Sequence, residues 1–317
     1  MNVMIVAQSG RWAVQSLLFA ETYVRSGSAA RNPLYIAVPE PGPLWPFDPR
    51  PPERYINRYR KLGAQLISFK NSDFGFRSGY TNKIYALFGL PANQPFMFLD
   101  SDQLVFSNLG NIDLDFDHPS AQLAKQSWPP ARSTFPHGEV WRAVYELTGA
   151  TQGREGSGRY FNAGCFYYVD PRRFGQVMLD ACLKLAETKI PAIANQPLIP
   201  APIDQVALSV AIERIGEGGA CPASLNSISL SDTTATWHYH RFSRFWLPGY
   251  ERAASLVEAI LKEEETGPLA RENDTLAFLG SALGRQVSVK ADEFLKKHQA
   301  KLKMRDAGKL MWQLGFE

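Results

Sequence analysis

The feature that most constrains the fold of this chain is an apolar run, Phe96–Leu99, that ends abruptly in the triplet Asp100-Ser101-Asp102. The run has no helical spacing, and this favours a strand buried on both faces of a sheet. Open α/β sheets bind their ligands at the carboxyl ends of such strands. Two carboxylates there are hard oxygen ligands for Mg2+ or Mn2+, ions that commonly share their shell with phosphates. The triplet therefore indicates a site for a metal-bridged diphosphate, whereas an isolated Asp-x-Asp more often caps a loop.

The segments around this strand predict an α/β fold with a mostly parallel central sheet flanked by helices. Strands are expected at residues 3–7, 34–38 and 65–69, and helices at residues 12–26 and 81–90. A strand-turn-helix-strand opening is how doubly wound sheets begin, and parallel strands bring their carboxyl ends to one rim. The residues that follow these strands are thus expected to meet beside the acidic triplet.

Composition narrows the possible partners and the compartment. The net charge of +3 over 317 residues is too small to indicate nucleic-acid binding, so small substrates are expected. Cys165, Cys182 and Cys221 show neither close pairing nor a cluster with histidine, which argues against a zinc site or a disulfide framework. No apolar run is long enough to span a bilayer, and the N-terminus lacks a signal-peptide pattern. The expected protein is soluble and cytoplasmic.

The triplet is accompanied by four more short blocks in a fixed order, at residues 81–84, 160–164, 202–205 and 238–246. Together the five blocks resemble the retaining glycosyltransferases of family eight, the glycogenin and bacterial lipooligosaccharide galactosyltransferase type. The resemblance covers residues 1–250 and implies a GT-A fold, in which a Rossmann-like nucleotide half joins an acceptor half in one compact domain. It also implies a sugar-nucleotide donor and Mn2+, or Mg2+ in its place. Residues 251–317 are expected to form a helical, basic C-terminal extension.

The resemblance also assigns the metal ligands. Asp100 and Asp102 match the family's Asp-x-Asp motif, with Asp100 and Ser101 also beside the nucleotide, and His238 matches the third ligand. A divalent ion stabilises the charge that builds on the leaving nucleoside diphosphate without a proton from the enzyme. The neighbouring His240 is interpreted as a packed, structural residue.

Other residues match donor-binding positions of the family. Gln8, Ser9 and Trp12 follow the first expected strand, where the nucleobase binds, and Trp12 corresponds to an aromatic residue that stacks on uracil. Trp12 could alternatively open the core face of the first helix. Lys83 and Arg77 correspond to basic residues that reach the sugar or the phosphates. The resemblance therefore implies a UDP-sugar donor.

Two arginines mark departures from the family pattern His-Phe-x-Gly-x-x-Lys-Pro-Trp. Arg244 stands at the phosphate-binding lysine, and Phe245 replaces the proline that follows it. Arginine holds phosphate oxygens in a bidentate fork, whereas lysine is a point charge. Arg241 replaces a glycine that lets the backbone approach the diphosphate, so it either adds a phosphate contact or signals a rearranged loop.

The catalytic residues implied by the resemblance are Asn162, Asp204 and Gln205. Asn162 lies in the block beside the transferred sugar and offers both a donor and an acceptor to its hydroxyls. Asp204-Gln205 matches the pair that faces the anomeric carbon, where a carboxylate forms a covalent glycosyl intermediate or stabilises an oxocarbenium-like ion. Without the resemblance, Asp204 is interpreted as the N-cap of a helix at residues 205–215. The segment at residues 222–226 is assigned a structural role.

The sequence thus predicts a metal-dependent retaining glycosyltransferase that moves a sugar from a nucleotide sugar to a saccharide or cell-surface glycan. One alternative, a nucleotidyltransferase, would need a longer Gly-rich loop after the first strand. Another, a non-catalytic sugar-nucleotide-binding protein, would account for the changes at Arg241 and Phe245. Residues 285–309 carry eight Lys or Arg against three Asp or Glu. This tail is expected either to pack on its own domain or a dimer partner, or to contact an anionic membrane peripherally.

Overall fold

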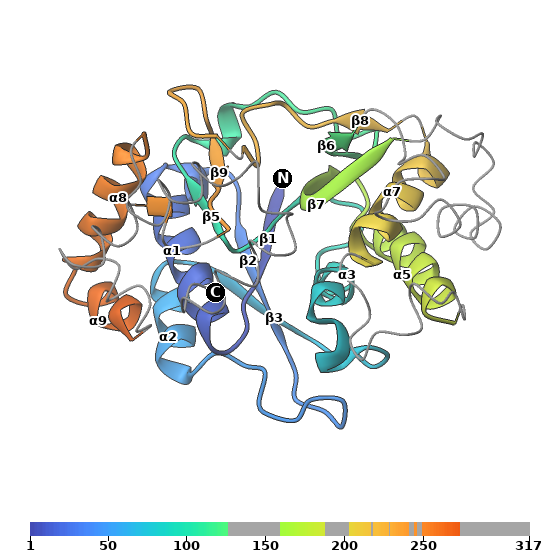
Figure 1. Ribbon diagram of the computed structural model, residues 1–317, viewed down its shortest axis with the longest axis horizontal. Helices are drawn as coiled ribbons and strands as arrows, with labels where there is room; N and C mark the ends of the chain where they lie inside the picture. Colours follow the sequence, from blue (N-terminus) through green and yellow to red (C-terminus); the bar gives the residue numbers. More distant parts are fainter. Residues whose placement is uncertain are drawn as a thin grey trace, which may run out of the picture.

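The computed structural model describes residues 1–125, 159–187, 203–216, 218–227, 229–240, 244–245 and 249–272. Its centre is a seven-stranded sheet in the order β3-β2-β1-β4-β7-β6-β8, with helices on both faces (Figure 1). Strands β3, β2, β1 and β4 are parallel to one another, β7 is antiparallel to β4 and β6, and β8 is parallel to β6. The strands are β1 (Asn2–Val6), β2 (Leu34–Pro39), β3 (Gln65–Phe69), β4 (Phe96–Leu99), β6 (Ser120–Lys125), β7 (Tyr160–Tyr168) and β8 (Gly219–Ala220). The expected α/β fold with a mainly parallel central sheet is confirmed.

The alternation of apolar side chains explains why the central strands are buried on both faces. In β1, Val3 and Ile5 belong to one hydrophobic core, and Met4 and Val6 belong to the other. Residues 96–99 of β4 divide between the two cores in the same way, and none of them is more than 1% exposed. Such a strand has no polar face, which is why its apolar run carries no period-two pattern.

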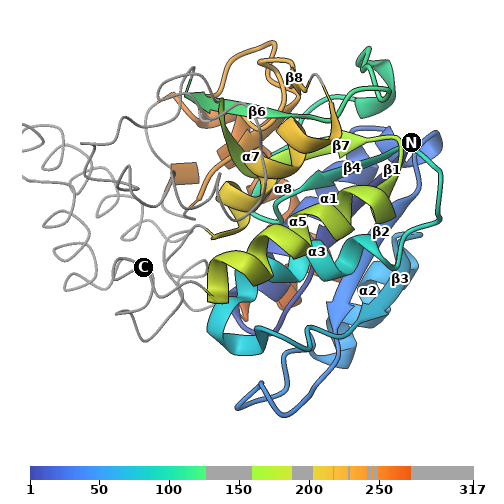
Figure 2. The same ribbon diagram turned by 90° about the vertical axis from the view of Figure 1, so that its right-hand side faces the viewer.

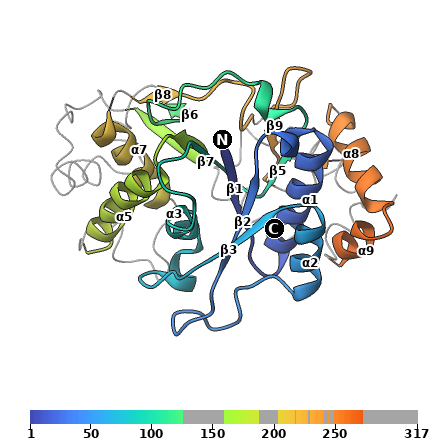
Figure 3. The same cartoon turned by 180° about the vertical axis from the view of Figure 1, so that it is seen from behind.

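Two groups of helices cover the two faces of the sheet. Helices α1, α2, α8 and α9 lie on one side and α3, α5 and α7 on the other (Figures 1 and 3), and Figure 2 shows α3 and α5 across the near face. The helices are α1 (Arg11–Arg25), α2 (Glu53–Lys61), α3 (Asn82–Leu87), α5 (Pro171–Glu187), α7 (Ile203–Ile215), α8 (Glu251–Leu261) and α9 (Thr266–Arg271). Short 3-10 helices span Ser28–Ala30, Gly75–Thr81 and Leu109–Asn111. The helix expected at residues 81–90 is shorter at both ends: a 3-10 helix includes Thr81, and after Leu87 the backbone N–H groups of residues 88–90 donate to carbonyls three residues back, as in turns.

A second, two-stranded sheet lies beside the acidic triplet. It pairs β5 (Gln103–Val105) with β9 (Thr236–His238) in antiparallel register, with Gln103 opposite His238. Because β5 follows the triplet directly, this pairing brings His238 beside it. The next backbone N–H, of Tyr239, donates to the Asp102 carbonyl at 3.1 Å. At His240 the chain turns with φ +57°, a left-handed conformation uncommon outside glycine.

The first part of the expected C-terminal extension packs on the main domain. Helices α8 and α9 lie against α1 and α2, and Ala253, Val257, Ile260 and Ala270 belong to the same core as α1. The rest of the expected extension, residues 273–317, lies outside the described residues, and the domain boundary at residue 250 stays a prediction. None of the helices in the described part of the chain is long and apolar enough to cross a membrane.

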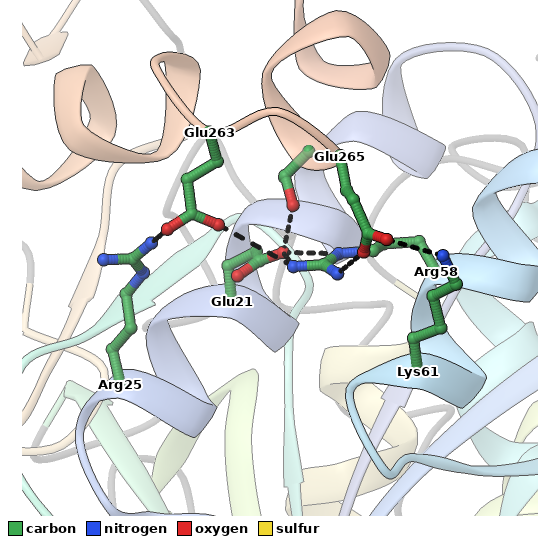
Figure 4. Close-up of polar contacts among 7 residues, drawn as sticks. Glu21, Arg25, Arg58, Lys61, Glu263 and Glu265 are labelled. Atoms are coloured by element: carbon green, nitrogen blue, oxygen red, sulfur yellow. Dashed lines mark hydrogen bonds and ion pairs between the residues drawn. The ribbon is translucent and has the colours of Figure 1, made fainter.

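A cluster of polar contacts joins helices α1 and α2 to residues 263–266, where α8 leads into α9 (Figure 4). The Glu21 carboxylate of α1 accepts hydrogen bonds from Arg58 Nε at 2.9 Å and Arg58 Nη2 at 2.7 Å, and another from Thr266 Oγ1. Arg58, on α2, also pairs with Glu263 at 3.7 Å and with Glu265. The side chains of Glu21 and Arg58 are only 4% and 14% exposed. We call these five residues the helix clamp, and its centre is a buried ion pair.

Candidate active site

A buried lysine joins two carboxylates at the carboxyl end of β4. The Lys83 ammonium, on α3, lies 3.0 Å from Asp100 Oδ1 and 3.0 Å from Asp204 Oδ2, and it donates to the Ala163 carbonyl at 3.1 Å. An ammonium has three N–H donors, so these three acceptors use its whole capacity. The Lys83 side chain is 7% exposed, and the ring of Phe98 lies 5.1 Å from its nitrogen. Lys83 therefore links the end of β4 to the start of α7.

The charges of this group depend on one another. Burial by itself lowers the pKa of Lys83, but the negative charges of Asp100 and Asp204 overcome this and raise the pKa above its ordinary value. Burial raises the pKa of Asp100, and the Lys83 ammonium opposes that rise. Lys83 consequently stays charged at neutral pH and compensates the carboxylates that flank it.

The second carboxylate of the triplet faces two histidines. Asp102 Oδ1 lies 2.8 Å from His238 Nε2, and Asp102 Oδ2 lies 4.0 Å from His240 Nδ1. Burial would raise the pKa of Asp102, but the hydrogen bond with His238 and the charge of both histidines hold it below its ordinary value. One ligand atom from each of the three residues lies within 4.8 Å of the others. A carboxylate and two imidazoles at this spacing fit a divalent metal ion.

Only two of the three expected metal ligands are in this group. Asp102 and His238 are brought together as predicted, whereas Asp100 is bound to Lys83. Sequence reasoning did not place His240, which was interpreted as structural, in this group. The His-x-His spacing at residues 238–240 is the signal that could have pointed to it. Ser101 lies half-buried between the two carboxylates.

Asn162, on β7, lies in a network of amides. Its Oδ1 accepts hydrogen bonds from the Gly164 N–H at 2.7 Å and from Asn226 Nδ2 at 3.2 Å. A Cβ at position 164 would lie 2.8 Å from that oxygen, so a larger residue there would displace the Asn162 side chain. The Asn162 oxygen is therefore occupied, and its Nδ2 group is what it can offer to a ligand, rather than both a donor and an acceptor as expected.

Asn226 is a residue of this site that sequence reasoning placed outside the chemistry. It is fully buried, adopts φ +51°, and donates its backbone N–H to Thr236 Oγ1 at 2.6 Å. Its side chain also donates to Gln122, whose Nε2 donates back to the Asn226 carbonyl at 2.8 Å. An asparagine is one of the few residues that tolerate this backbone conformation, which is the signal that could have found it.

The start of α7 corrects the capping interpretation of Asp204. The helix begins at Ile203, so Asp204 lies in its first turn and its carboxylate binds Lys83 instead of capping the helix. The other carboxylate oxygen, Oδ1, is buried and has no hydrogen-bond partner among the described residues. Gln205 Oε1 accepts from the Tyr160 hydroxyl at 2.8 Å, which connects α7 to β7.

The expected nucleobase residues follow β1 on the same rim. Trp12 is 41% exposed, so the alternative that it opens the core face of α1 is wrong. The guanidinium carbon of Arg11 lies 5.1 Å from the Trp12 ring centroid. The Ser9 N–H donates to the Pro49 carbonyl at 2.8 Å, which ties the turn to the loop after β2. The residue before it, Gln8, is half-buried.

The structure describes one of the three expected phosphate-binding arginines. Arg244 is half-buried, and its Nη1 is buried without a hydrogen-bond partner in the described part of the chain. Phe245, the departure beside it, is fully buried with its ring centroid 4.6 Å from that of Tyr239. Arg241 and the side chain of Arg77 lie outside the described residues.

Comparison with solved structures shows similarity to glycosyltransferases. The galactosyltransferase LgtC, solved in complex with donor and acceptor sugar analogues, is 13% identical, with a TM-score of 0.47 over 82% of this chain and 96% of that one. GlyE of Streptococcus pneumoniae TIGR4 is 14% identical, with a TM-score of 0.42 over 81% of this chain and 49% of that chain. The bifunctional glycosyltransferase WbbM is 12% identical, with a TM-score of 0.52 over 86% of this chain and 51% of that chain. The WbbM similarity shows a shared fold.

Comparison of sequences identifies the family. No match was found among curated proteins. Residues 3–216 match the family described as Rhodobacterales glycosyltransferase domain, which is more than half of the chain. The resemblance to glycosyltransferases predicted from the acidic triplet and its companion blocks is confirmed, and the chain belongs to the Rhodobacterales glycosyltransferase domain family.

Proposed function

We propose that this glycosyltransferase moves a hexosyl group from a UDP-sugar to a hydroxyl of a saccharide or cell-surface glycan, with a divalent ion and with retention of the anomeric configuration. The observation that carries the proposal is the meeting of Asp100, Asp102 and Asp204 with Lys83 and His238 at the carboxyl end of β4. Ligands of open α/β sheets bind at this edge. A nucleotide sugar carries a negatively charged diphosphate beside a sugar that becomes cationic as its bond to the phosphate breaks. These residues offer groups of both positive and negative charge.

The donor chemistry of the site fits a divalent ion. Asp102 and His238 would hold Mn2+ or Mg2+, with Asp100 in the expected ligand set. When bound, such an ion stabilises the negative charge of the leaving nucleoside diphosphate as a Lewis acid. Arg244 is proposed to add a phosphate contact, which its buried and unpartnered Nη1 supports. Arg241, like Arg77, stays a proposed phosphate or sugar contact.

The sugar is proposed to lie between Asn162 and Asp204. Asn162 offers its amide N–H groups, because its oxygen is already bonded. Asp204 lies 3.0 Å from the Lys83 ammonium and is proposed to face the cationic sugar, as a nucleophile or as an electrostatic stabiliser. Lys83 holds Asp204 from α3, and Gln205, the next residue on α7, accepts a hydrogen bond from the Tyr160 hydroxyl.

The nucleobase is proposed to bind where the chain leaves β1. The exposed ring of Trp12 offers a stacking face, and Gln8 and Ser9 offer polar groups beside it. Stacking does not distinguish one base from another, so uracil rests on the resemblance. The proposal is tested by the base that the enzyme accepts.

Two further expectations stay proposals. The transferase domain is proposed to span residues 1–250, with residues 251–317 as a C-terminal extension. Residues 285–309 lie outside the described residues, and their basic character supports a peripheral contact with an anionic membrane at the cytoplasmic face. Packing on the domain or on a second subunit is the competing outcome.

The test is Mn2+-dependent release of nucleoside diphosphate from a panel of UDP-sugars and GDP-sugars without acceptor. We expect release from a UDP-sugar and an at least roughly hundredfold loss of turnover in Asp102→Asn. The matched control is Asp115→Asn, because Asp115 also pairs with a histidine, His118 at 2.7 Å, but at the exposed surface. Binding of UDP without any release, or equal turnover in the two variants, would refute metal-dependent transfer at Asp102.

A further inference from the structure

We propose that His240 takes the place of Asp100 as the third protein ligand of the divalent ion. The ion is then held by one carboxylate and two imidazoles, Asp102, His238 and His240. This inference rests on the proposed function, since it concerns the same metal. The expected ligand set contains Asp100 as its third member. In the proposed set Asp100 is paired with Lys83 and is not a ligand.

The geometry places His240 within reach of the ion. The two carboxylate oxygens of Asp102 face different rings, Oδ1 toward His238 and Oδ2 toward His240. The centroids of the two imidazole rings are 3.8 Å apart with 36° between their planes. His240 follows the end of β9 by two residues and has a left-handed backbone conformation, with φ +57°. One donor atom from each of the three residues lies within 4.8 Å of the other two.

Asp100 is already paired with another positive charge, the Lys83 ammonium. Its Oδ1 lies 3.0 Å from the Lys83 ammonium, which also binds Asp204 and the Ala163 carbonyl. A metal ion on Asp100 would stand close to that buried ammonium, and two positive charges at short range repel one another strongly in a poorly solvated site. Release of Lys83 from Asp100 would instead leave one of its N–H donors unpaired in the interior. Both routes disfavour Asp100 as a ligand.

A ligand set rich in imidazole changes which ion the site prefers. Mg2+ favours oxygen ligands and is bound weakly by imidazole, whereas nitrogen ligands suit the later transition metals. The site is therefore expected to bind Mn2+ more tightly than Mg2+, and Co2+ more tightly than Mn2+. An Asp-Asp-His set with two carboxylates would discriminate less between Mg2+ and Mn2+.

The experiment measures metal coordination directly in the full-length protein. Pulsed electron paramagnetic resonance of bound Mn2+ counts the imidazole nitrogens coupled to the ion, and calorimetry gives the Mn2+ affinity, each with and without UDP. We expect two coupled imidazoles in the wild type and one in His240→Asn, with an at least roughly tenfold loss of affinity. Asparagine keeps the left-handed backbone that position 240 requires. His118→Asn, at the surface, is the matched control and should change neither quantity.

Asp100→Asn separates the two ligand sets. We expect this variant to keep two coupled imidazoles and a wild-type Mn2+ affinity, because asparagine can still accept from Lys83. A single coupled imidazole in the wild type, or an Asp100→Asn affinity as low as that of Asp102→Asn, would overturn the inference. So would a wild type that binds no Mn2+ even with UDP. Two coupled imidazoles without nucleoside diphosphate release would refute the proposed function and leave the ligand set standing.

Discussion

The helix clamp makes a quantitative prediction about the described part of the C-terminal extension. Arg58→Met removes the only cation paired with Glu21 among the described residues and leaves that carboxylate 4% exposed, with the Thr266 hydroxyl as its partner. Breaking a buried ion pair on one side costs about 3–5 kcal/mol of folding free energy, because the remaining charge stays buried and uncompensated. For a chain of this size, about 2 °C is lost per kcal/mol, so the melting temperature should fall by roughly 6–10 °C.

A surface pair in the same region provides the control. Arg54 donates to Glu272 through Nε to Oε1 at 2.6 Å and through Nη2 to Oε2 at 2.6 Å, but its side chain is 55% exposed. Arg54→Met should therefore change the melting temperature little, because water solvates the carboxylate that is left. Both variants are measured by calorimetry and by urea denaturation followed with circular dichroism.

The double variant tests the reasoning about the buried charge. Glu21→Gln in the Arg58→Met background removes the uncompensated carboxylate, so the double variant should regain much of the stability lost by Arg58→Met. If the double variant is as unstable as the sum of the two single variants, burial of charge is not the cause. If the Arg58→Met variant has the same melting temperature as Arg54→Met, close to that of the wild type, the clamp does not hold α9 on α1 and α2.

Further predictions concern the site and the tail. Asp204→Asn should lower turnover at least roughly a hundredfold with a nearly unchanged melting temperature, since the charge and not the shape is lost; near-normal nucleoside diphosphate release would return Asp204 to a structural role. Asn226→Asp replaces the N–H donor to Asn162 with an acceptor, so KM for the donor sugar should rise while calorimetric binding of UDP alone is retained; equal weakening of both would contradict this role. Deletion of residues 285–317 should abolish salt-sensitive binding to anionic vesicles but spare donor hydrolysis; early melting or aggregation would show that the tail belongs to the core.

The strands and the acidic triplet could be predicted because their signals are local. Residues 65–69 and Phe96–Leu99 are strands with the expected bounds, since an apolar run between turn residues has few other structures open to it. The start of α7 was predicted at residue 205, whereas the helix begins at Ile203. Asp204 matches the local pattern of a helix cap, but its carboxylate binds a lysine from α3.

The contacts within the candidate site are long-range, and this is why sequence reasoning named residues that meet there but not all of their partners. Lys83 was expected to reach the donor, yet it lies between two carboxylates that enter from β4 and α7. His240 and Asn226 both depend on positive φ angles and on strand pairing between distant segments. Neither the pairing partner nor the turn is specified by the neighbouring residues alone.

The pairing of β5 with β9 has a consequence for the nascent chain. Synthesis supplies the strands β1 to β4 first, and domains begin to fold as their N-terminal parts emerge. Until residues 236–238 follow, β5 is an unpaired edge and Asp102 has neither imidazole beside it. A ribosome-bound intermediate that ends after α7 thus carries the acidic triplet without His238 and His240. With the ligand set proposed above, metal binding is expected only after residue 240 has been synthesised.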